Sequence, residues 1–360
     1  MNPSATPPKR GAVINPHNRF EKLEVVLDEE IEHEESRRNP RTVFYQDDTQ
    51  SLITTNDSPD IGFNASINVY RGCEHGCPYC YARPFHEYLG FSSGLDFETK
   101  ILVKAAAPEL LRRELSSPKW HPQSLAMSGV TDCYQPVERK LQLTRRCLEV
   151  LAEFRNPVGI VTKNHLVTRD IDLLAELASL NAARVYVSVT SLNSDLARRL
   201  EPRASLPTHR LDAIRKLTEA GIPAGVMVAP VIPGLNDHEI PSILAAAREA
   251  GARQAGFVVV RLPYAVKDIF SAWLDEQLPG SKEKILHRIR EMRGGKLNDS
   301  NFGSRMRGEG PVAEEIHQLF KVSAHRAGLD RKLEPLSVEH FRRPGGKQLE
   351  LEFFAENYSG

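Results

Sequence analysis

The sequence predicts an α/β protein: a parallel sheet of six strand–helix units, closed or partly closed like a barrel, with a helical C-terminal extension. Short Val- and Ile-rich stretches alternate with amphipathic helices between about residues 56 and 265, the order expected of a parallel β-α architecture. Nearly every residue of these stretches is apolar, as expected for strands buried on both faces. Eight units are not found, so we expect a partial (β/α)6 barrel in place of a complete one.

We expect the chain to have four regions. A polar tail covers residues 1–55, the barrel residues 56–265, a helical extension residues 266–340 and a second tail residues 341–360. The first tail is predicted from its Pro-rich start and from an acidic stretch followed by arginines, a composition typical of solvated segments.

The expected strands are short and rich in β-branched residues. In chain order they are Ser66–Tyr70, Ser124–Val130, Val158–Thr162, Arg184–Thr190, Ala224–Val228 and Gly256–Val260. The helices expected between them are Glu138–Phe154, Asp170–Leu180, one from Thr208 to Gly221 and one from Asp237 to Gly251, the last two ended by glycine. The extension should contain Lys267–Leu278, Lys282–Arg293 and Pro311–Ala327, with a Gly-rich cationic loop, Arg293–Gly310, between the last two.

Composition and charge exclude several classes of protein. Hydrophobic residues make up 41% and charged residues 26% of the 360 residues, as in ordinary globular proteins. Lys and Arg number 47, as do Asp and Glu, so the chain has no global basic field of the kind that sequence-blind nucleic-acid binding requires. The apolar runs are far too short to span a bilayer, and the N-terminus lacks the apolar segment of a signal peptide. We therefore expect a cytoplasmic protein with no membrane partner.

The most informative feature is a cysteine loop directly after the first expected strand. Three of the five cysteines, Cys73, Cys77 and Cys80, follow one another with the spacing C-x3-C-x2-C. Three thiolates this close suit an iron–sulfur cluster that keeps one iron open for a substrate or cofactor. Structural zinc prefers four ligands, so a Cys3His site with His75 or His86 is the alternative.

At this loop the sequence resembles the radical S-adenosylmethionine (SAM) superfamily, whose signature is C-x3-C-x-aromatic-C after the first barrel strand. Cys73, Cys77, Tyr79 and Cys80 match that signature position by position. The resemblance implies that the cysteines hold a 4Fe–4S cluster and that SAM chelates its fourth iron. It also implies a low-potential electron donor of the flavodoxin or ferredoxin type and reductive cleavage of SAM to a 5′-deoxyadenosyl radical.

Further segments resemble the branch related to spore photoproduct lyase, often labelled "DNA repair photolyase", whose members are largely uncharacterised. The resemblance covers about residues 60–265. The segments are Tyr81–Tyr88, Gly94–Glu98, Val130–Glu138 and Thr162–Asn164.

Chemistry in such barrels lies at the C-terminal ends of the strands. This rule indicates Thr131 and Asp132 after the second strand, Lys163 after the third, Ser188 at the end of the fourth and Arg261 after the sixth. We expect Asp132 and Lys163 to be catalytic and Thr131 to contact the cofactor. A simple turn before a helix and a polar strand end are the alternative interpretations of these positions.

The resemblance also implies contacts to SAM. The backbone around Tyr79 would face the adenine, Ser188 would contact the ribose or carboxylate, and Val231 belongs to a turn that would line the adenine. Arg203 could form a fork for the SAM carboxylate, although an arginine before a helix is also typical of a protein surface.

The two remaining cysteines differ in what they suggest. Cys133 is a candidate hydrogen donor because spore photoproduct lyase is expected to use a cysteine, but related sequences usually have proline at this position. Cys147 shares a helical face with Leu151 and Phe154, so we expect a core thiol.

The sequence thus predicts a radical SAM enzyme that acts on nucleic acid, with lyase-like or repair-like chemistry on an unidentified substrate. The alternatives are a radical SAM enzyme for a small molecule or a protein side chain, and a non-catalytic metal-bearing binding module. The cationic loop could grip phosphates. The tail Gln348–Phe354 loosely resembles peptides that bind bacterial sliding clamps, and an edge strand folding back on the domain is the alternative.

Overall fold

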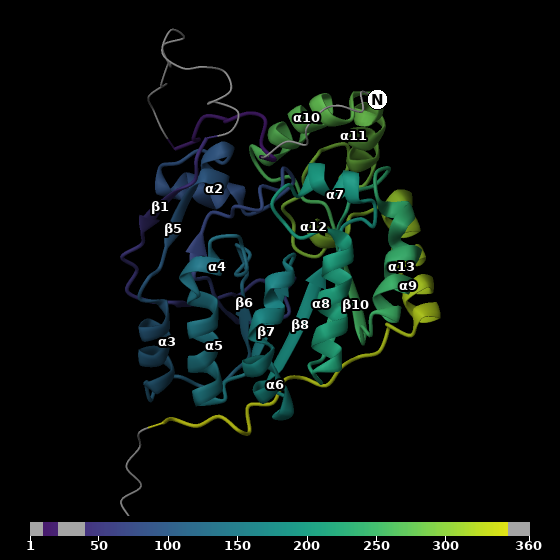
Figure 1. Ribbon diagram of the computed structural model, residues 1–360. Helices are drawn as coiled ribbons and strands as arrows, with labels where there is room; N and C mark the ends of the chain where they lie inside the picture. The colour runs from purple at the N-terminus through teal and green to yellow at the C-terminus, as the bar shows by residue number, and fades with distance from the viewer. Residues whose placement is uncertain (1–9, 21–39, 345–360) are drawn as a thin grey trace, which may run out of the picture.

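The computed structural model describes residues 10–20 and 40–344. Two sheets organise this part of the chain (Figure 1). The larger sheet has the order β10-β9-β8-β7-β6-β3-β2, and the smaller has the order β1-β5-β4. The strands of the larger sheet are β2 (Ile53–Thr55), β3 (Ala65–Ile67), β6 (Leu125–Met127), β7 (Val158–Thr162), β8 (Ala183–Ser188), β9 (Ala224–Val231) and β10 (Gln254–Val259). Those of the smaller sheet are β1 (Val43–Gln46), β4 (Tyr70–Arg71) and β5 (Lys100–Val103).

The six strands from β3 to β10 in the larger sheet pair in parallel with their neighbours, and only β2 runs antiparallel. Helices connect these strands and cover one face of the sheet (Figure 1). They are α3 (Ala107–Ser116), α4 (Glu138–Leu141), α5 (Leu143–Phe154), α6 (Ile171–Ser179), α7 (Ser194–Leu200), α8 (Pro207–Glu219) and α9 (Ile240–Glu249), with short 3-10 helices at His165–Asp170 and Asp237–Glu239. The predicted α/β fold with six parallel strands is confirmed.

Several boundaries differ from the prediction for identifiable reasons. The first expected strand is split, because the chain leaves β3 and enters the second sheet as β4 before the cysteine loop. The helix expected over Glu138–Phe154 breaks at Gln142, whose φ of 52° is left-handed. α8 begins at Pro207, since proline is well suited to the first helical turn.

The strands are less completely buried than their apolar composition predicts. In β7, Val158 and Ile160 are buried under the helices, whereas Val161, on the opposite face, is 43% exposed. Successive residues of a strand point to opposite faces. At this strand, the face of the sheet away from the helices is therefore less buried than the face beneath them.

The N-terminal region is not the solvated tail that we expected over residues 1–55, in the parts that the structure describes. Residues 43–46 pair with β5 and residues 53–55 pair with β3. Arg10, Gly11 and Ala12 are buried against the cysteine loop. The sequence pattern missed this because the partner that buries them, Glu98, is far away in the chain. The domain boundaries themselves stay a prediction.

The helical extension packs on the last barrel helices. It contains α10 (Val266–Gln277), a 3-10 turn at Pro279–Ser281, α11 (Lys282–Glu291), α12 (Ser304–Arg307) and α13 (Pro311–Ala327), and α13 packs against α9. The chain then crosses the N-terminal edge of the sheet (Figure 1), where Arg342 N donates to Phe154 O. The predicted segment Gln348–Phe354 lies outside the described residues. Across residues 10–20 and 40–344, no helix has the length and apolarity needed to cross a membrane.

Candidate active site

The cysteine loop leaves β4 and is followed by the 3-10 helix η1 (Arg83–Leu89) and by α2 (Leu95–Thr99). Its shape depends on backbone contacts: Cys73 N donates to Phe97 O (2.9 Å) and Cys80 N donates to Cys77 O (3.2 Å). Gly72 and Gly76 have φ values of 79° and 72°, which favour glycine. The loop is therefore a defined turn and not a flexible connection.

Cys73, Cys77 and Cys80 are free thiols, and their chemistry fits a cluster. Burial raises the pKa of all three, and the sulfur of Cys73 lies close enough to the other two that they raise its pKa further. Buried thiols of this kind become thiolates when a metal binds them. Within the described residues, no three His, Cys, Asp or Glu side chains meet at single-ion distance. Cysteines around a cluster, in contrast, each bind a different iron.

Of the two histidines of the zinc alternative, His75 has polar partners on both ring nitrogens, whereas His86 is held by ring packing and its buried Nε2 has no hydrogen-bond partner. His75 Nδ1 lies 3.4 Å from Asp132 Oδ2, and its Nε2 lies 3.3 Å from Asn164 Nδ2. His86 packs against the rings of Phe91 and Phe97, and burial lowers its pKa to about 4. The residues present therefore fit a three-cysteine cluster better than a Cys3His zinc site.

The outer side of the cysteine loop is covered by the N-terminal segment. A Cβ on Gly11 would lie 1.5 Å from Gly76 O, so the two backbones are in direct contact. Glu98 accepts hydrogen bonds from Gly11 N (3.1 Å) and Ala12 N (2.7 Å). It also forms a buried ion pair with Arg83, whose Nη2 lies 2.5 Å away. Arg83 in turn donates to Cys77 O (2.9 Å), which joins the segment, the loop and α2 into one unit.

Arg203, predicted to bind the SAM carboxylate, lies beside this loop. Its Nη2 is 2.8 Å from Glu74 Oε1, and its Nη1 donates to Thr42 Oγ1 (3.2 Å). The guanidinium is thus engaged by protein groups, and its predicted contact with SAM stays a prediction.

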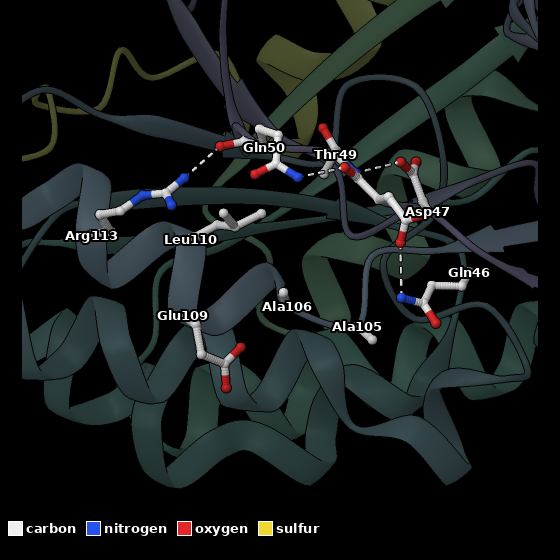
Figure 2. A pocket seen from close by; sticks show the side chains of 10 residues that line it. Gln46, Asp47, Thr49, Gln50, Ala105, Ala106, Glu109, Leu110 and Arg113 are labelled. Atoms are coloured by element: carbon white, nitrogen blue, oxygen red, sulfur yellow. Dashed lines mark hydrogen bonds between the residues drawn. The ribbon is translucent and has the colours of Figure 1, made fainter.

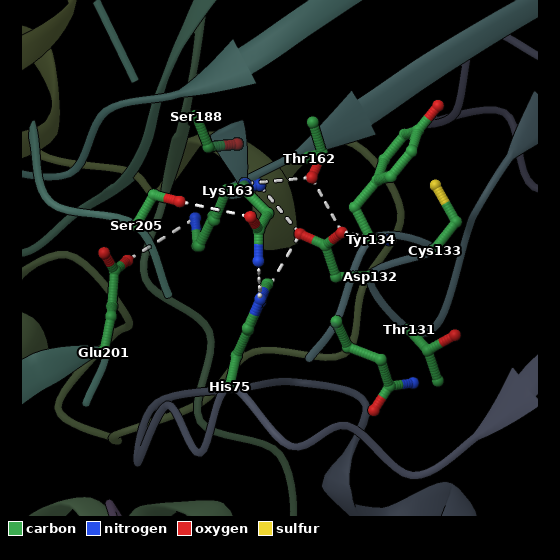
Figure 3. A network of polar contacts seen from close by, with 12 residues as sticks. His75, Thr131, Asp132, Cys133, Tyr134, Thr162, Lys163, Ser188, Glu201 and Ser205 are labelled. Atoms are coloured by element: carbon green, nitrogen blue, oxygen red, sulfur yellow. Dashed lines mark hydrogen bonds and ion pairs between the residues drawn. The ribbon is translucent and has the colours of Figure 1, made fainter. Parts of the chain in front are cut away.

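The inner side of the loop faces a polar network at the strand ends (Figure 3). Asp132 is the centre of this network. Its Oδ1 accepts from Thr162 Oγ1 (2.7 Å), and its Oδ2 accepts from Lys163 N (2.7 Å) and faces His75. The carboxylate therefore ties the cysteine loop to the ends of β6 and β7, as its position in the sequence predicts.

Lys163 joins this network to a buried glutamate. Its Nζ donates to Ala229 O (2.8 Å) and lies 3.6 Å from Glu201 Oε1. The positive charge of Lys163 also acts to lower the pKa values of Cys77 and Cys80, which places it within electrostatic reach of those sulfurs. The structure places Lys163 beside Asp132 in this network, and the predicted catalytic roles of both residues stay predictions.

Glu201 was not singled out by sequence reasoning, and it forms the second centre. It accepts hydrogen bonds from Tyr79 Oη, Thr190 Oγ1 and Arg210 Nη2. Burial alone would raise the pKa of Glu201, but the charges of Arg210 and Lys163 and these hydrogen bonds lower it to about 2. The signal that could have found it is an acidic residue in the connection after the fourth strand, nine residues before a basic residue of the next helix.

The other predicted residues lie around the network with different orientations. Ser188 is buried at the end of β8, and its carbonyl accepts from Arg210 Nη1 (3.0 Å). Thr131 and Cys133 point away from the side chain of Asp132 (Figure 3). Val231 is fully buried in the main core. The roles of these residues toward SAM stay predictions. The side chain of Val231 has no exposed surface.

Cys133 lies in the apolar core with Cys147, and both are fully buried. The Sγ of Cys133 lies 4.0 Å from Met127 O, and burial raises its pKa well above the usual range. Its Sγ is enclosed by the protein, and the role of Cys133 as a hydrogen donor stays a prediction. The expectation of a core thiol at Cys147 agrees with its burial.

The cationic loop Arg293–Gly310 is engaged largely by the protein itself. Arg293 donates to Val260 O (2.9 Å) and Ser304 O (2.9 Å), and Arg305 Nε pairs with Asp60 Oδ2 (2.5 Å). These contacts fix the loop against the barrel. The expectation that this loop grips phosphates stays a prediction.

A separate hollow of about 580 Å³ lies between the end of β1 and the start of α3 (Figure 2). Polar and apolar groups line it about equally, and the polar side chains include those of Asp47, Gln50, Glu109 and Arg113. None of the predicted site residues lines it, so it is distinct from the cysteine loop and the strand-end network.

With this geometry established, the comparisons identify the class of protein. The Radical SAM superfamily model matches residues 67–247, half of the chain, and the chain belongs to this superfamily. It is therefore a radical SAM enzyme. The family uses a 4Fe–4S cluster, SAM and a reductant.

Among related sequences, an uncharacterised protein of Mycobacterium tuberculosis is 36% identical over 232 residues, covering 64% of this chain and 67% of the relative. An uncharacterised protein of Methanocaldococcus jannaschii is 32% identical over 173 residues, 48% of this chain and 62% of the relative. The Radical SAM Nalpha-GlyT isomerase of Pseudomonas phage M6 is 27% identical over 293 residues, 81% of this chain and 57% of the relative.

Among solved structures, spore photoproduct lyase is similar in fold. A double mutant of that enzyme with bound AdoMet and dinucleoside spore photoproduct has a TM-score of 0.58, with 17% identity over 79% of both chains. At this identity the likeness concerns the fold alone.

Proposed function

We propose that Cys73, Cys77 and Cys80 hold the 4Fe–4S cluster and that the enzyme acts on a nucleic-acid substrate. When bound, the cluster and SAM supply a 5′-deoxyadenosyl radical by reductive cleavage of SAM. The observation that carries the proposal is the buried cysteine loop at the strand ends, with charged groups of the barrel gathered on its inner side.

The chain's own residues would position and shield this chemistry. Glu201 holds the Tyr79 hydroxyl and so fixes the loop between Cys77 and Cys80. Lys163 and Asp132 bring a cation and a carboxylate to the inner side of the loop. There Lys163 would pair with the carboxylate of SAM, and Asp132 would accept a hydrogen bond from its amine. Ser188 lies next to this network and is the candidate for the ribose. Burial of the loop excludes water from the reacting groups.

The nucleic-acid part of the proposal is supported by one likeness. The fold is similar to that of spore photoproduct lyase, which was solved with a dinucleoside spore photoproduct. The balanced charge of the chain indicates that phosphate contacts supply little of the affinity. We expect the electron donor to be of the flavodoxin or ferredoxin type.

The test is an anaerobic reaction of reconstituted, reduced enzyme with SAM and with single-stranded DNA, duplex DNA or RNA. We expect one of these polymers to increase 5′-deoxyadenosine formation and to yield a nucleoside altered in mass or retention time after digestion. If the enzyme cleaves SAM at the same rate with and without every polymer, and no nucleoside is altered, nucleic acid is not the substrate.

A further inference from the structure

Exposed aromatic rings gather beside the cysteine loop. We use the name aromatic surface for Phe20, Phe85, Tyr88 and Tyr264 together with the guanidinium of Arg19. The four rings are between 51% and 66% exposed. They come from three segments: the N-terminal segment, η1, and the loop that follows β10. Large exposed rings are costly in water, so their gathering calls for a reason.

The rings are arranged around the guanidinium. The Cζ of Arg19 lies 3.8 Å from the ring centroid of Tyr264, 4.7 Å from that of Phe20 and 5.5 Å from that of Tyr88. The centroids of Phe20 and Tyr88 are 4.9 Å apart. Phe85 precedes Tyr88 by three residues in a 3-10 helix, so both project from the same side of η1. The result is a set of flat rings interleaved with one planar cation.

Polar contacts beneath the rings hold this arrangement in place. Arg19 Nε pairs with the buried Glu87 Oε2 (2.7 Å). Asn18 Nδ2 donates to Glu87 O (2.9 Å) and Phe91 O (3.1 Å), which fixes the N-terminal segment on η1. Tyr264 has a φ of 49°, a left-handed conformation that a bulky residue rarely adopts. Strain of this kind is concentrated at ligand clamps and other functional sites.

We propose that the aromatic surface binds unpaired nucleobases of the substrate by stacking. This inference rests on the proposed function, which makes nucleic acid the substrate. It adds the surface that holds this substrate and the kind of contact that holds it. Every base has an aromatic face, and aromatic side chains interleaved with arginine form the usual platform for single-stranded nucleic acid. η1 begins three residues after Cys80, and Tyr264 follows β10 at the C-terminal edge of the sheet. The surface therefore lies on the side of the molecule where the cysteine loop emerges.

Binding by stacking, unlike binding through phosphates, agrees with the balanced charge of the chain. The chain has no net charge, and Glu87 balances the one cation of the aromatic surface. Binding through rings needs no excess of positive charge, so the affinity should depend only weakly on salt, unlike binding through phosphate contacts.

The test is fluorescence anisotropy of the anaerobic holoenzyme with a short labelled single-stranded oligonucleotide and with the matched duplex. We expect Tyr88→Ala and Tyr264→Ala each to weaken single-strand binding by roughly 5- to 100-fold, the value of one base–aromatic stack. Tyr88→Phe and Tyr264→Phe keep the ring and should bind as the wild type does. Phe44→Ala, which removes a ring of similar exposure (47%) from β1, is the matched control and should also bind normally.

Three outcomes would overturn the inference: no binding of the single strand by the wild type, equal binding by the alanine variants, or equal binding of the duplex. The two proposals fail separately. Single-strand binding that the alanine variants lose, with no altered nucleoside and no stimulation of SAM cleavage by any polymer, keeps the stacking surface and contradicts the proposed substrate. Polymer-stimulated cleavage that the alanine variants retain in full, with unchanged affinity, keeps the proposed substrate and contradicts the stacking surface.

Discussion

The two sides of the cysteine loop are built from different kinds of contact. On the outer side, the buried pair Arg83–Glu98 satisfies backbone groups of the loop and of residues 11 and 12. On the inner side, Asp132, Lys163 and Glu201 present charged side chains from the strand ends. The difference teaches that one side determines the shape of the loop and the other its chemical environment. Substitutions on the outer side should lower the free energy of unfolding. Substitutions on the inner side should lower the rate of SAM cleavage while the loop keeps its structure.

The largest effect should come from the loop itself. We expect Cys77→Ala to lose its iron and all SAM cleavage, because two thiolates do not hold the cluster. Iron and sulfide analysis after anaerobic reconstitution measures this. Cys147→Ala removes a core thiol that lies outside the loop and should keep the iron content of the wild type. Equal iron content in the two variants would contradict the assignment of the ligands.

On the outer side, Glu98→Gln should lower the free energy of unfolding by about 3–5 kcal/mol, because it leaves the fully buried Arg83 without its counter-charge. Urea denaturation measures the loss. Glu153→Gln is the matched control, since its pair with Arg112 is exposed and should be worth about 0–1 kcal/mol. Similar losses in the two variants would show that the buried pair stabilises the protein no more than the exposed pair does.

Acid should lower the stability of the protein through the buried His86. Its pKa is about 4 when folded and about 6.5 when unfolded, so below pH 6.5 the unfolded chain binds a proton that the folded chain does not. Stability from this group should fall by roughly 3 kcal/mol as the pH drops from 6.5 to 4. His86→Phe should flatten this part of the profile relative to wild type, whereas replacement of the exposed His287 by Gln should not. Parallel profiles for wild type and His86→Phe would refute this account.

On the inner side, Lys163→Met should keep the cluster and reduce 5′-deoxyadenosine per cluster by about 10- to 100-fold, the value of one hydrogen bond to a charged group. The SAM concentration dependence should shift as well, which a purely structural role would not cause. Lys321→Met on the exposed face of α13 is the control. Loss of iron together with activity would instead show that Lys163 stabilises the cysteine loop, as the residues on its outer side do.

The smallest effect concerns the contact of the N-terminal segment with the loop. Gly11→Ala places a Cβ against Gly76 O and should cost about 1–3 kcal/mol, with faster loss of the cluster in air. Gly62→Ala has open space around its Cβ and should be neutral. Identical cluster lifetimes in the two variants would mean that the segment does not protect the loop.

The sequence predicted the inner side of the site better than the outer side. The cysteine spacing, Asp132 and Lys163 all belong to local patterns: a motif and the ends of buried strands. The contact between Gly11 and Glu98 carries no such pattern, although Glu98 lies in one of the segments that resemble the branch. It joins residues 87 apart and uses a backbone N–H that almost every residue has. Glu201 was missed since its meaning depends on Arg210 and Tyr79, which the fold brings to it.

The most direct test of the central claim is 5′-deoxyadenosine formation by anaerobically reconstituted, dithionite-reduced enzyme with SAM, beside Cys77→Ala. Our account predicts product from the wild type and none from the variant. Product from both proteins, or no product from wild-type enzyme that carries a full four-iron cluster, would contradict it.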